Sequence, residues 1–329
     1  MNKLLARLLE KEIYFVLAVA VLWEVLILSI VDKGASYWLQ FWWMFPIALA
    51  IATIVNTVGI SGAALFVPFF VLIFPLLAGQ PLAGEQSVKL GLITESFGLS
   101  SSALAFLRYG LIDKKLGVKA VLVAVPFVIA GAVLSFFLPQ YAFYFIIAFA
   151  LLFSVYLMLS TERKLSKEEC IKKMSVGKHH THPNAENVTL KDRDGKEYKY
   201  CRACGVKPRS VGYGVGGFFQ GVGGFGIGEL GIVSMLLTKI PIRVAIGTSH
   251  MVVAMTAIVA SLTHIITSNL ESVPTAWNIL AMTVPAVLAG GQIAPYLAAR
   301  FKTDALEHFV AGLFIILAVA LTIVGITKL

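Results

Sequence analysis

Two sets of residues in this sequence have the types and the spacing to do chemistry. The first is a glycine-dense run over 212–228, in which Gly223, Gly224, Gly226 and Gly228 come directly before a short apolar segment. Glycine lets the backbone turn sharply, and a helix that starts after such a break presents unpaired N–H groups and the positive end of its dipole. This arrangement can bind an anion without lysine or arginine. We expect the earlier glycines of the run to serve close helix packing instead.

The second set lies in the polar segment 161–209. His179-x2-His182 is followed 18 residues later by Cys201-x2-Cys204, which is zinc-ribbon-like spacing. Thiolate and imidazole ligands suit tetrahedral Zn²⁺, and so short a segment would gain stability from a metal. We therefore predict Zn²⁺ bound by these four side chains, and no organic cofactor. The alternatives are a disordered linker with incidental histidines and a redox-active Cys-x2-Cys. Two alternative ligands are Cys170 and His180.

Ionisable residues are rare in the apolar stretches, and there they are hypotheses of function by default because charge is costly in lipid. They are Glu24, Lys89, Glu95, Glu229, His250 and His264. Glu229 lies at the glycine break, where a bare carboxylate would repel an anion. We predict that Glu229 carries a coupling proton, with His250 as a possible partner. The alternative is a structural hydrogen bond to a neighbouring helix.

The composition decides what kind of protein must position these residues. Hydrophobic residues make up 58% of the 329 residues and charged residues 14%, against about 25% charged in soluble domains. Of the 27 basic and 18 acidic residues, 20 lie in 161–209. So little charge cannot cover the surface of a soluble globule. The sequence therefore predicts a polytopic membrane protein with one polar insert, and excludes a soluble enzyme, a nucleic-acid binder and a secreted disulfide scaffold.

The apolar stretches predict the helices, since a span needs about 20 apolar residues. They are 13–31, 39–58, 62–78, 86–107, 117–138, 141–160, 210–227, 229–238, 244–268, 276–297 and 308–327. No polar loop separates 39–58 from 62–78, or 210–227 from 229–238, so we expect each pair to form a broken or re-entrant hairpin inside the membrane. The other seven stretches are predicted as full spans, and we interpret the first as a retained helix rather than a signal peptide.

The basic residues predict the orientation, because cytoplasmic loops collect lysine and arginine. With the N-terminus and the insert in the cytoplasm and the C-terminus outside, 24 of the 27 basic residues lie inside. Within the insert, residues 187–191 and 196–200 alternate around Asp192-Arg193-Asp194-Gly195, which predicts a short β-hairpin. The net charge of +9 therefore reports topology rather than a nucleic-acid partner.

The two halves of the chain repeat. The sequence VPFVIAG at 125–131 recurs as VPAVLAG at 284–290, and each half runs hairpin, turn with proline, then three spans. Under the predicted orientation the two copies are inverted, which is the pattern of a secondary transporter that works by alternating access. We predict an all-α membrane protein with an N-terminal transmembrane helix (1–38), a first repeat (39–160), a zinc-ribbon-like insert (161–209) and a second repeat (210–329).

The second half carries the pattern GVGGFGIGELGIVSMLLTKIP at 221–241, followed by AIGTS at 245–249, and NTVGISGAALFVPFF at 56–70 is a weaker copy. These motifs resemble the TauE/SafE family of sulfite and organosulfonate exporters. The resemblance implies transport of small sulfur-containing anions, such as sulfite, thiosulfate or sulfoacetate, across a prokaryotic inner membrane. This chain departs from the pattern at Glu229-Leu230, where the family has glycine and an aliphatic-proline pair, and the first half lacks a glycine triplet.

The predicted partners are a small anion and the lipid bilayer. The predicted substrate-binding residues are Asn56, Gly59, Ser61, Gly62, Thr94, Gln220, Gly223, Gly224, Gly226, Gly228, Thr248 and Ser249. An anion channel is an alternative function. Another is an intramembrane serine protease, because Gly59-Ile60-Ser61-Gly62 matches the G-x-S-G of rhomboid-type proteases, with His250 or His264 as base.

Overall fold

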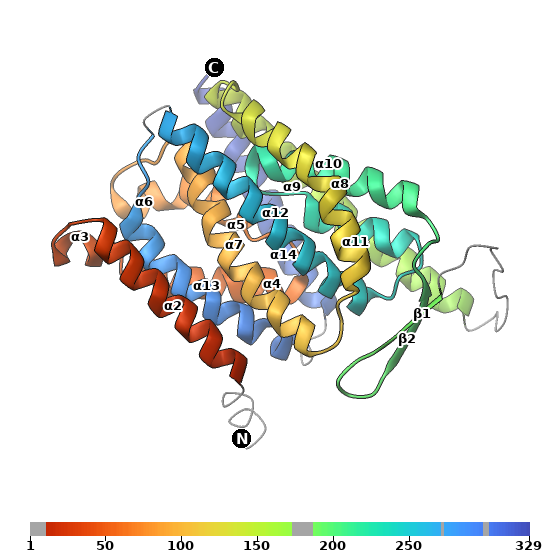
Figure 1. The fold of residues 1–329 in the computed structure, drawn as a ribbon. Coiled ribbons are helices and arrows are strands. Elements are labelled where there is room, and N and C mark those ends of the chain that lie inside the picture. Colours follow the sequence, from red (N-terminus) through yellow and green to blue (C-terminus); the bar gives the residue numbers. More distant parts are fainter. Residues whose placement is uncertain (1–10, 173–186, 271–272, 299–302) are drawn as a thin grey trace.

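A computed structural model describes residues 11–172, 187–270, 273–298 and 303–329. The chain forms a bundle of helices from which one two-stranded sheet projects (Figure 1). The first helices are α2 (Lys11–Ile30), α3 (Ala35–Leu39), α4 (Met44–Val58), α5 (Ala63–Pro68), η1 (Phe69–Ile73), α6 (Phe74–Ala78), α7 (Gly84–Arg108), α8 (Lys114–Ser135) and α9 (Gln140–Lys172). The elements that follow are β1 (Asn187–Lys191), β2 (Glu197–Cys201), α10 (Val206–Gly223), α11 (Ile227–Leu237), α12 (Ile242–Leu270), α13 (Trp277–Ala298) and α14 (Thr303–Thr327).

Seven helices in the described part of the chain are long and apolar enough to cross a membrane, and they are the seven predicted spans: α2, α7, α8, α9, α12, α13 and α14. Large apolar side chains on their outer faces stay uncovered by protein. Leu22 in α2, Leu122 in α8 and Ile316 in α14 are each more than 60% exposed. Such faces suit a hydrocarbon solvent, in which helices satisfy their own backbone hydrogen bonds. The chain is a multi-pass membrane protein, as the composition predicted.

Two helix pairs are interrupted at the predicted glycine positions. Helix α4 ends at Gly59, whose φ is +88°, and α5 starts at Ala63. Helix α10 ends at Gly224, whose φ is +81°, and α11 starts at Ile227. A residue in the left-handed region ends a helix, and glycine adopts it without steric cost. Helix α11 has 11 residues, about 16 Å at 1.5 Å per residue, and is too short to cross a bilayer.

The most extensive helix packing joins the two halves of the chain. Helix α10 packs along α8, α13 packs along α4, and α12 packs along α7. Small residues bring backbones together: a Cβ on Gly221 would lie 2.0 Å from the Val128 carbonyl oxygen, and one on Gly131 would lie 2.1 Å from that of Phe218. The glycine-rich helix therefore serves close packing against α8. The inversion of the two repeats stays a prediction.

The predicted β-hairpin is confirmed, with β1 and β2 antiparallel and Asn187 opposite Cys201. The hairpin lies at one end of the bundle, far from α2 and α3 (Figure 1). Its turn places Gly195 at φ +85° and closes with the Gly195 N–H donating to the Asp192 carbonyl at 3.0 Å. Tyr198 and Tyr200 are buried in the same apolar cluster as Leu111, so the hairpin is docked on the bundle.

The zinc prediction is wrong. Cys201 and Cys204 are joined by a disulfide, which leaves neither as a thiolate ligand. No group of three or more histidine, cysteine or acidic side chains that could hold a metal occurs among the described residues. His179 and His182, the other two predicted ligands, lie outside the described residues.

Candidate functional site

The two helix breaks meet in the interior of the bundle. A Cβ on Gly224 would lie 2.4 Å from the Cβ of Ala63, and one on Gly228 would lie 3.3 Å from the backbone nitrogen of Ser61. Gly62 lies beside Glu95 of α7, where an added Cβ would be in ordinary contact with the Glu95 Cγ at 3.5 Å. Glycine is required here because the backbones of two hairpins approach each other more closely than side chains permit. The breaks therefore form one site rather than two.

Glu95 links the two breaks through side-chain hydrogen bonds. The Ser61 hydroxyl of the first break contacts one Glu95 carboxyl oxygen and also the Gly224 carbonyl of the second break. The other Glu95 oxygen accepts from Gln220 Nε2 of α10 at 2.8 Å. Ser61 and Gln220 are fully buried and Glu95 is 2% exposed. We call Ser61, Glu95, Gln220 and Glu229 the polar cluster.

Glu229 closes the polar cluster at the start of α11. One of its carboxyl oxygens accepts from the Gly226 N–H at 3.1 Å, and the other lies 3.4 Å from the N–H of Ser61. These are the backbone donors of the glycine breaks, one from each hairpin. The donors that the sequence predicts for an anion thus hold a carboxylate of the chain itself, which is the usual behaviour of an acidic residue in the first turn of a helix.

The structure brings most of the predicted binding residues to this site. Ser249 of α12 donates to the Gly228 carbonyl at 3.2 Å, so α12 also contacts the second break. Three other predicted residues have partners elsewhere. Thr94 contacts Thr283 of α13 at 3.0 Å, and the Thr248 hydroxyl accepts from the Asp113 N–H at 3.0 Å. The Asn56 amide donates along its own helix, to the Ala52 carbonyl at 2.7 Å.

His250 follows Ser249 in α12 and is buried, but it makes no hydrogen bond to Glu229 among the described contacts. Its Nδ1 lies 2.8 Å from the Ile246 carbonyl oxygen, and its ring packs on Phe106 with centroids 4.7 Å apart. A proton transfer between His250 and Glu229 stays a prediction. The hydroxyl of Ser61 contacts Glu95 and Gly224, whereas a serine protease would need a histidine base at that hydroxyl.

Glu95 is the residue that the predicted site lacked. The sequence marked it as an intramembrane carboxyl but gave it no role in binding. Its partners come from α10 and from the first break, 125 and 34 residues away in sequence. An intramembrane acid on a helix that follows a glycine break was the available signal.

A second buried polar group lies where the hairpin docks. Asp113, the N-cap of α8, accepts from Leu116 N–H, from the Tyr200 hydroxyl at 2.7 Å and from Arg202 Nε at 2.8 Å. Burial by itself would raise the pKa of this carboxyl, but these hydrogen bonds and the arginine charge outweigh burial and hold the pKa below its usual range. Burial and the neighbouring Asp113 carboxylate raise the pKa of Tyr200.

Comparisons with known proteins agree with this architecture. The family model described as "Sulfite exporter TauE/SafE" matches residues 44–321. The chain is also similar to a protein of Bacillus subtilis (strain 168) named "Probable membrane transporter protein YunE", with 24% identity over 287 residues that cover 85% of this chain and 96% of that protein. No solved structure matches the chain.

Proposed function

This chain belongs to the sulfite exporter TauE/SafE family and is a membrane transporter, and from this premise we propose that it moves small sulfur-containing anions by alternating access with proton coupling. Sulfite, thiosulfate and organosulfonates such as sulfoacetate are the candidate substrates. The observation that carries the proposal is the meeting of two glycine breaks at buried carboxyl groups. The remaining steps concern the anion, the protons and the motion.

The anion would bind the backbone donors at the breaks. The N–H groups of Ser61 and Gly226 now face Glu229, so an oxyanion that uses them must displace its carboxyl group. Two unit negative charges about 4 Å apart repel each other by about 4 kcal/mol at an effective dielectric constant near 20. An anion and an ionised Glu229 therefore exclude each other. We propose that Glu229 takes up a proton when the anion binds.

Glu95 offers a place for a second proton. Ser61 has one hydroxyl proton but contacts two oxygens that accept hydrogen bonds, the Glu95 carboxylate and the Gly224 carbonyl. Both contacts are hydrogen bonds if Glu95 is protonated and donates to Ser61, which then donates to Gly224. An ionised Glu95 would take the only proton and leave the Gly224 carbonyl facing a lone pair. The geometry favours a neutral Glu95 in this state of the protein.

The crossed packing of the halves supports alternating access. Helix α10 packs on α8, and α13 packs on α4, as an exchange of equivalent elements between two copies would require. Interrupted helices at corresponding places in two repeats are typical of secondary transporters. We propose that residues 39–160 and 210–329 are inverted repeats that exchange roles around the polar cluster. The helix at 1–38 and the insert at 161–209 would then be additions.

The proposed orientation places the hairpin in the cytoplasm of a prokaryotic cell, with the N-terminus inside and the C-terminus outside, because this arrangement puts most basic residues inside. Lys239 and Arg243 then flank the inner end of the second hairpin. We propose the inner membrane as the location. Reaction of single engineered cysteines with a membrane-impermeant maleimide, in intact and in opened cells, tests the orientation.

Flux into proteoliposomes tests the function directly. The purified protein is assayed with sulfite, thiosulfate, sulfoacetate and taurine, and with acetate as a carboxylate control, each with and without a pH gradient. We expect saturable flux of at least one sulfur-containing anion that a proton gradient drives. Absence of flux for every sulfur-containing anion contradicts the proposed substrate class. Flux that does not saturate and ignores the proton gradient would support a channel instead.

A further inference from the structure

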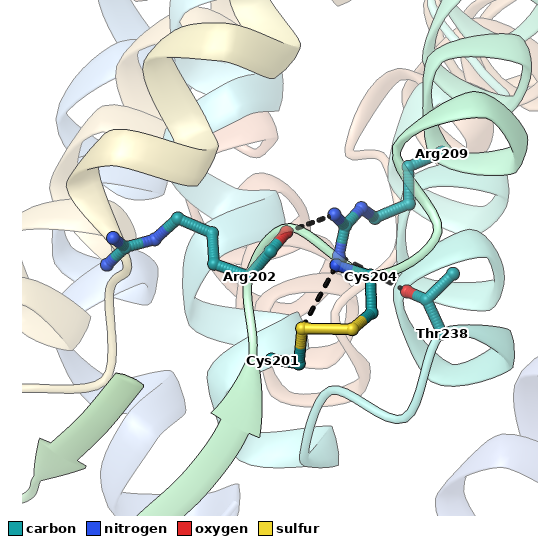
Figure 2. The surroundings of a disulfide bond; sticks show 5 residues. All are labelled: Cys201, Arg202, Cys204, Arg209 and Thr238. Atoms are coloured by element: carbon teal, nitrogen blue, oxygen red, sulfur yellow. Dashed lines mark hydrogen bonds between the residues drawn. A yellow bond between two sulfur atoms is a disulfide. The ribbon is translucent and has the colours of Figure 1, made fainter. Parts of the chain in front are cut away.

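The disulfide between Cys201 and Cys204 lies in a setting that suits exchange with other thiols (Figure 2). Cys201 ends β2, and Cys204 comes directly before Gly205, the N-cap of α10. The Cys204 N–H lies 3.2 Å from Cys201 Sγ. An N–H donor and the positive end of a helix dipole both stabilise a thiolate, and both cysteines are only partly buried beside the exposed Ala203. Because the Cys204 N–H points at Cys201 Sγ, Cys201 is the better leaving thiolate of the two.

Arg202, between the two cysteines, is held from both ends. Its guanidinium Nε donates to the Asp113 carboxylate at 2.8 Å, and its carbonyl oxygen accepts from Arg209 Nη2. Figure 2 shows Arg202 and Arg209 on either side of the disulfide, with Arg209 reaching Thr238. Thr238 caps the end of α11, the helix that starts at the second glycine break. The short disulfide loop thus joins the hairpin to α8, α10 and α11.

From Asp113 the contacts continue to the second glycine break. The Asp113 backbone N–H donates to the Thr248 hydroxyl in α12, and the next residue, Ser249, donates to the Gly228 carbonyl at the second break. The hairpin also contacts the turn between α7 and α8, where the Arg193 N–H donates to the Tyr109 carbonyl at 3.1 Å. A change at residues 201–204 can therefore alter the support of the second break.

We propose that Cys201 and Cys204 form a thiol–disulfide exchange site for a dithiol reductant, and that reduction releases Arg202 from Asp113, loosens the docked hairpin and changes the transport rate. A donor thiolate attacks Cys204 Sγ, the bond between the two protein sulfurs breaks, and Cys201 leaves as a thiolate. The second donor thiol, as its thiolate, then attacks the mixed disulfide and displaces the Cys204 thiolate. The donor ends as its own disulfide, and the two protons that its thiols lost end on the protein sulfurs, so the protein gains two thiols.

Opening the ring frees the backbone at Arg202, because the disulfide restricts the residues that it encloses. The arginine then loses the fixed geometry that points its guanidinium at Asp113 and its carbonyl at Arg209. Disulfides are rare in reducing cytoplasm, and those that form there are usually transient or regulatory. The effect on transport rests on the proposed function and orientation, whereas the exchange chemistry does not.

The first test measures the exchange site without transport. Full-length protein in nanodiscs is treated with dithiothreitol, alkylated and digested, and hydrogen exchange is followed over 187–201. We expect the peptide that contains Cys201 and Cys204 to gain two alkyl groups only after reduction. We also expect the amide hydrogens of 187–201 to exchange about tenfold faster after reduction, which is the scale of losing one charged hydrogen bond. Oxidised dithiothreitol should reverse both changes. Amide hydrogen exchange rates that do not change on reduction, or a disulfide that does not re-form, overturn the proposal.

Variants separate the disulfide from general effects of the reductant. Cys170→Ser should behave as the native protein, since that position is outside the pair. The double variant Cys201→Ser/Cys204→Ser should show the amide hydrogen exchange rates of the reduced protein, and dithiothreitol should not change them. In Arg202→Gln the amides of 187–201 should exchange fast whether the cysteine pair is oxidised or reduced, because the variant removes the contact with Asp113 and keeps the disulfide. A redox response that persists in the double variant contradicts the assignment.

The second test measures initial flux in proteoliposomes with the pair oxidised and reduced. We expect a change of at least about threefold, absent in the double variant, on the scale of allosteric coupling. Flux that is present but independent of the redox state refutes the regulatory part of the proposal. If no anion is transported in either state, the proposed function fails, while the hydrogen-exchange result still decides the exchange site.

Discussion

The two glycine breaks have the same backbone design but satisfy their polar groups differently. Each begins with a left-handed glycine, Gly59 at φ +88° and Gly224 at φ +81°. The second break carries its own acid, because Glu229 turns back onto the Gly226 N–H within the same helix start. The first break carries a hydroxyl, Ser61, and borrows the carboxyl of Glu95 from α7.

This difference assigns different tasks to the two carboxyl groups. Glu229 lies on backbone donors that hold its ionised form in place, and under the proposed function an anion competes with it for the same N–H groups. Glu95 shares the single Ser61 hydroxyl proton with the Gly224 carbonyl, and both contacts are hydrogen bonds only when Glu95 is protonated. In a buried site, separate environments are what allow two carboxyl groups to hold protons at different stages of a cycle.

The largest effect is expected on stability at the second break. Gly224→Ala adds a left-handed strain of about 1–2 kcal/mol and an overpacking cost of about 1–3 kcal/mol, since its Cβ would lie 2.4 Å from that of Ala63. Gly59→Ala meets the side chains of Ile246, at 3.1 Å, and Ile232, at 3.4 Å, rather than a Cβ at 2.4 Å, and should cost about 1–2 kcal/mol. Thermal unfolding in detergent measures both.

The control for these variants is Gly312→Ala in α14, where nothing lies within 4 Å of the added Cβ. It should be neutral or stabilising by up to about 1 kcal/mol, as for alanine in a helix interior. If Gly59→Ala destabilised the protein as much as Gly224→Ala, the close contact at the second break would not matter, and the breaks would be equivalent.

The next effect concerns the two acids. Glu229→Gln keeps an acceptor for the break N–H groups but cannot ionise, so we expect proton-driven flux to fall about 100-fold, the scale of losing a positioned proton carrier. Glu95→Gln imitates the neutral acid, and should lose proton-driven flux by a similar factor while the protein keeps its stability. Flux against external pH and melting temperature are measured for both. A variant with the native pH profile removes that residue from the coupling mechanism.

A smaller effect on stability is expected from removing the hydroxyl groups that contact the second break, those of Ser61 and Ser249. Ser61→Ala removes the hydroxyl that contacts one Glu95 carboxyl oxygen and the Gly224 carbonyl, and should cost about 1–3 kcal/mol. Ser249→Ala removes one bond of 3.2 Å to the Gly228 carbonyl and should cost about 0.5–1.5 kcal/mol. Thermal unfolding is again the measurement. Equal losses of stability in the two variants would mean that Ser61 does not bridge the two glycine breaks.

The smallest effect is a pH dependence at the support of the second break. The pKa of Asp113 is below its usual value in the folded protein, so its contribution is complete above the unfolded value of about 3.9 and is lost as the pH falls through the lowered pKa. We expect the hairpin to stay docked at neutral pH and to loosen in strong acid. Fluorine NMR of 3-fluorotyrosine at Tyr200 reports this change, and Tyr200→Phe assigns the signal.

The matched control is Asp113→Asn, which should loosen the hairpin at every pH because an amide does not hold the Arg202 charge. A Tyr200 signal that shifts with acid in the same way in this variant would show that another group titrates.

Local patterns predicted much of the fold. Apolar runs gave the seven spans, because crossing a bilayer demands about 20 such residues regardless of their neighbours. The turn sequence Asp192–Gly195 predicted the bounds of the β-hairpin to within one residue, because such a turn depends on a glycine with positive φ. Spacing alone misled at Cys201 and Cys204, because the same Cys-x2-Cys suits a metal and a disulfide, and only the distance between the sulfurs distinguishes the two.

The sequence by itself determined that this is a multi-pass membrane protein of the TauE/SafE family with two glycine breaks. These properties follow from hydropathy and backbone freedom, which act over a few residues. The tertiary structure decided that the breaks touch, that Ser61 meets Glu229 across 168 residues of chain, and that Glu95 joins them. Such contacts depend on how helices pack, and local spacing holds no information about which distant backbone a glycine will approach.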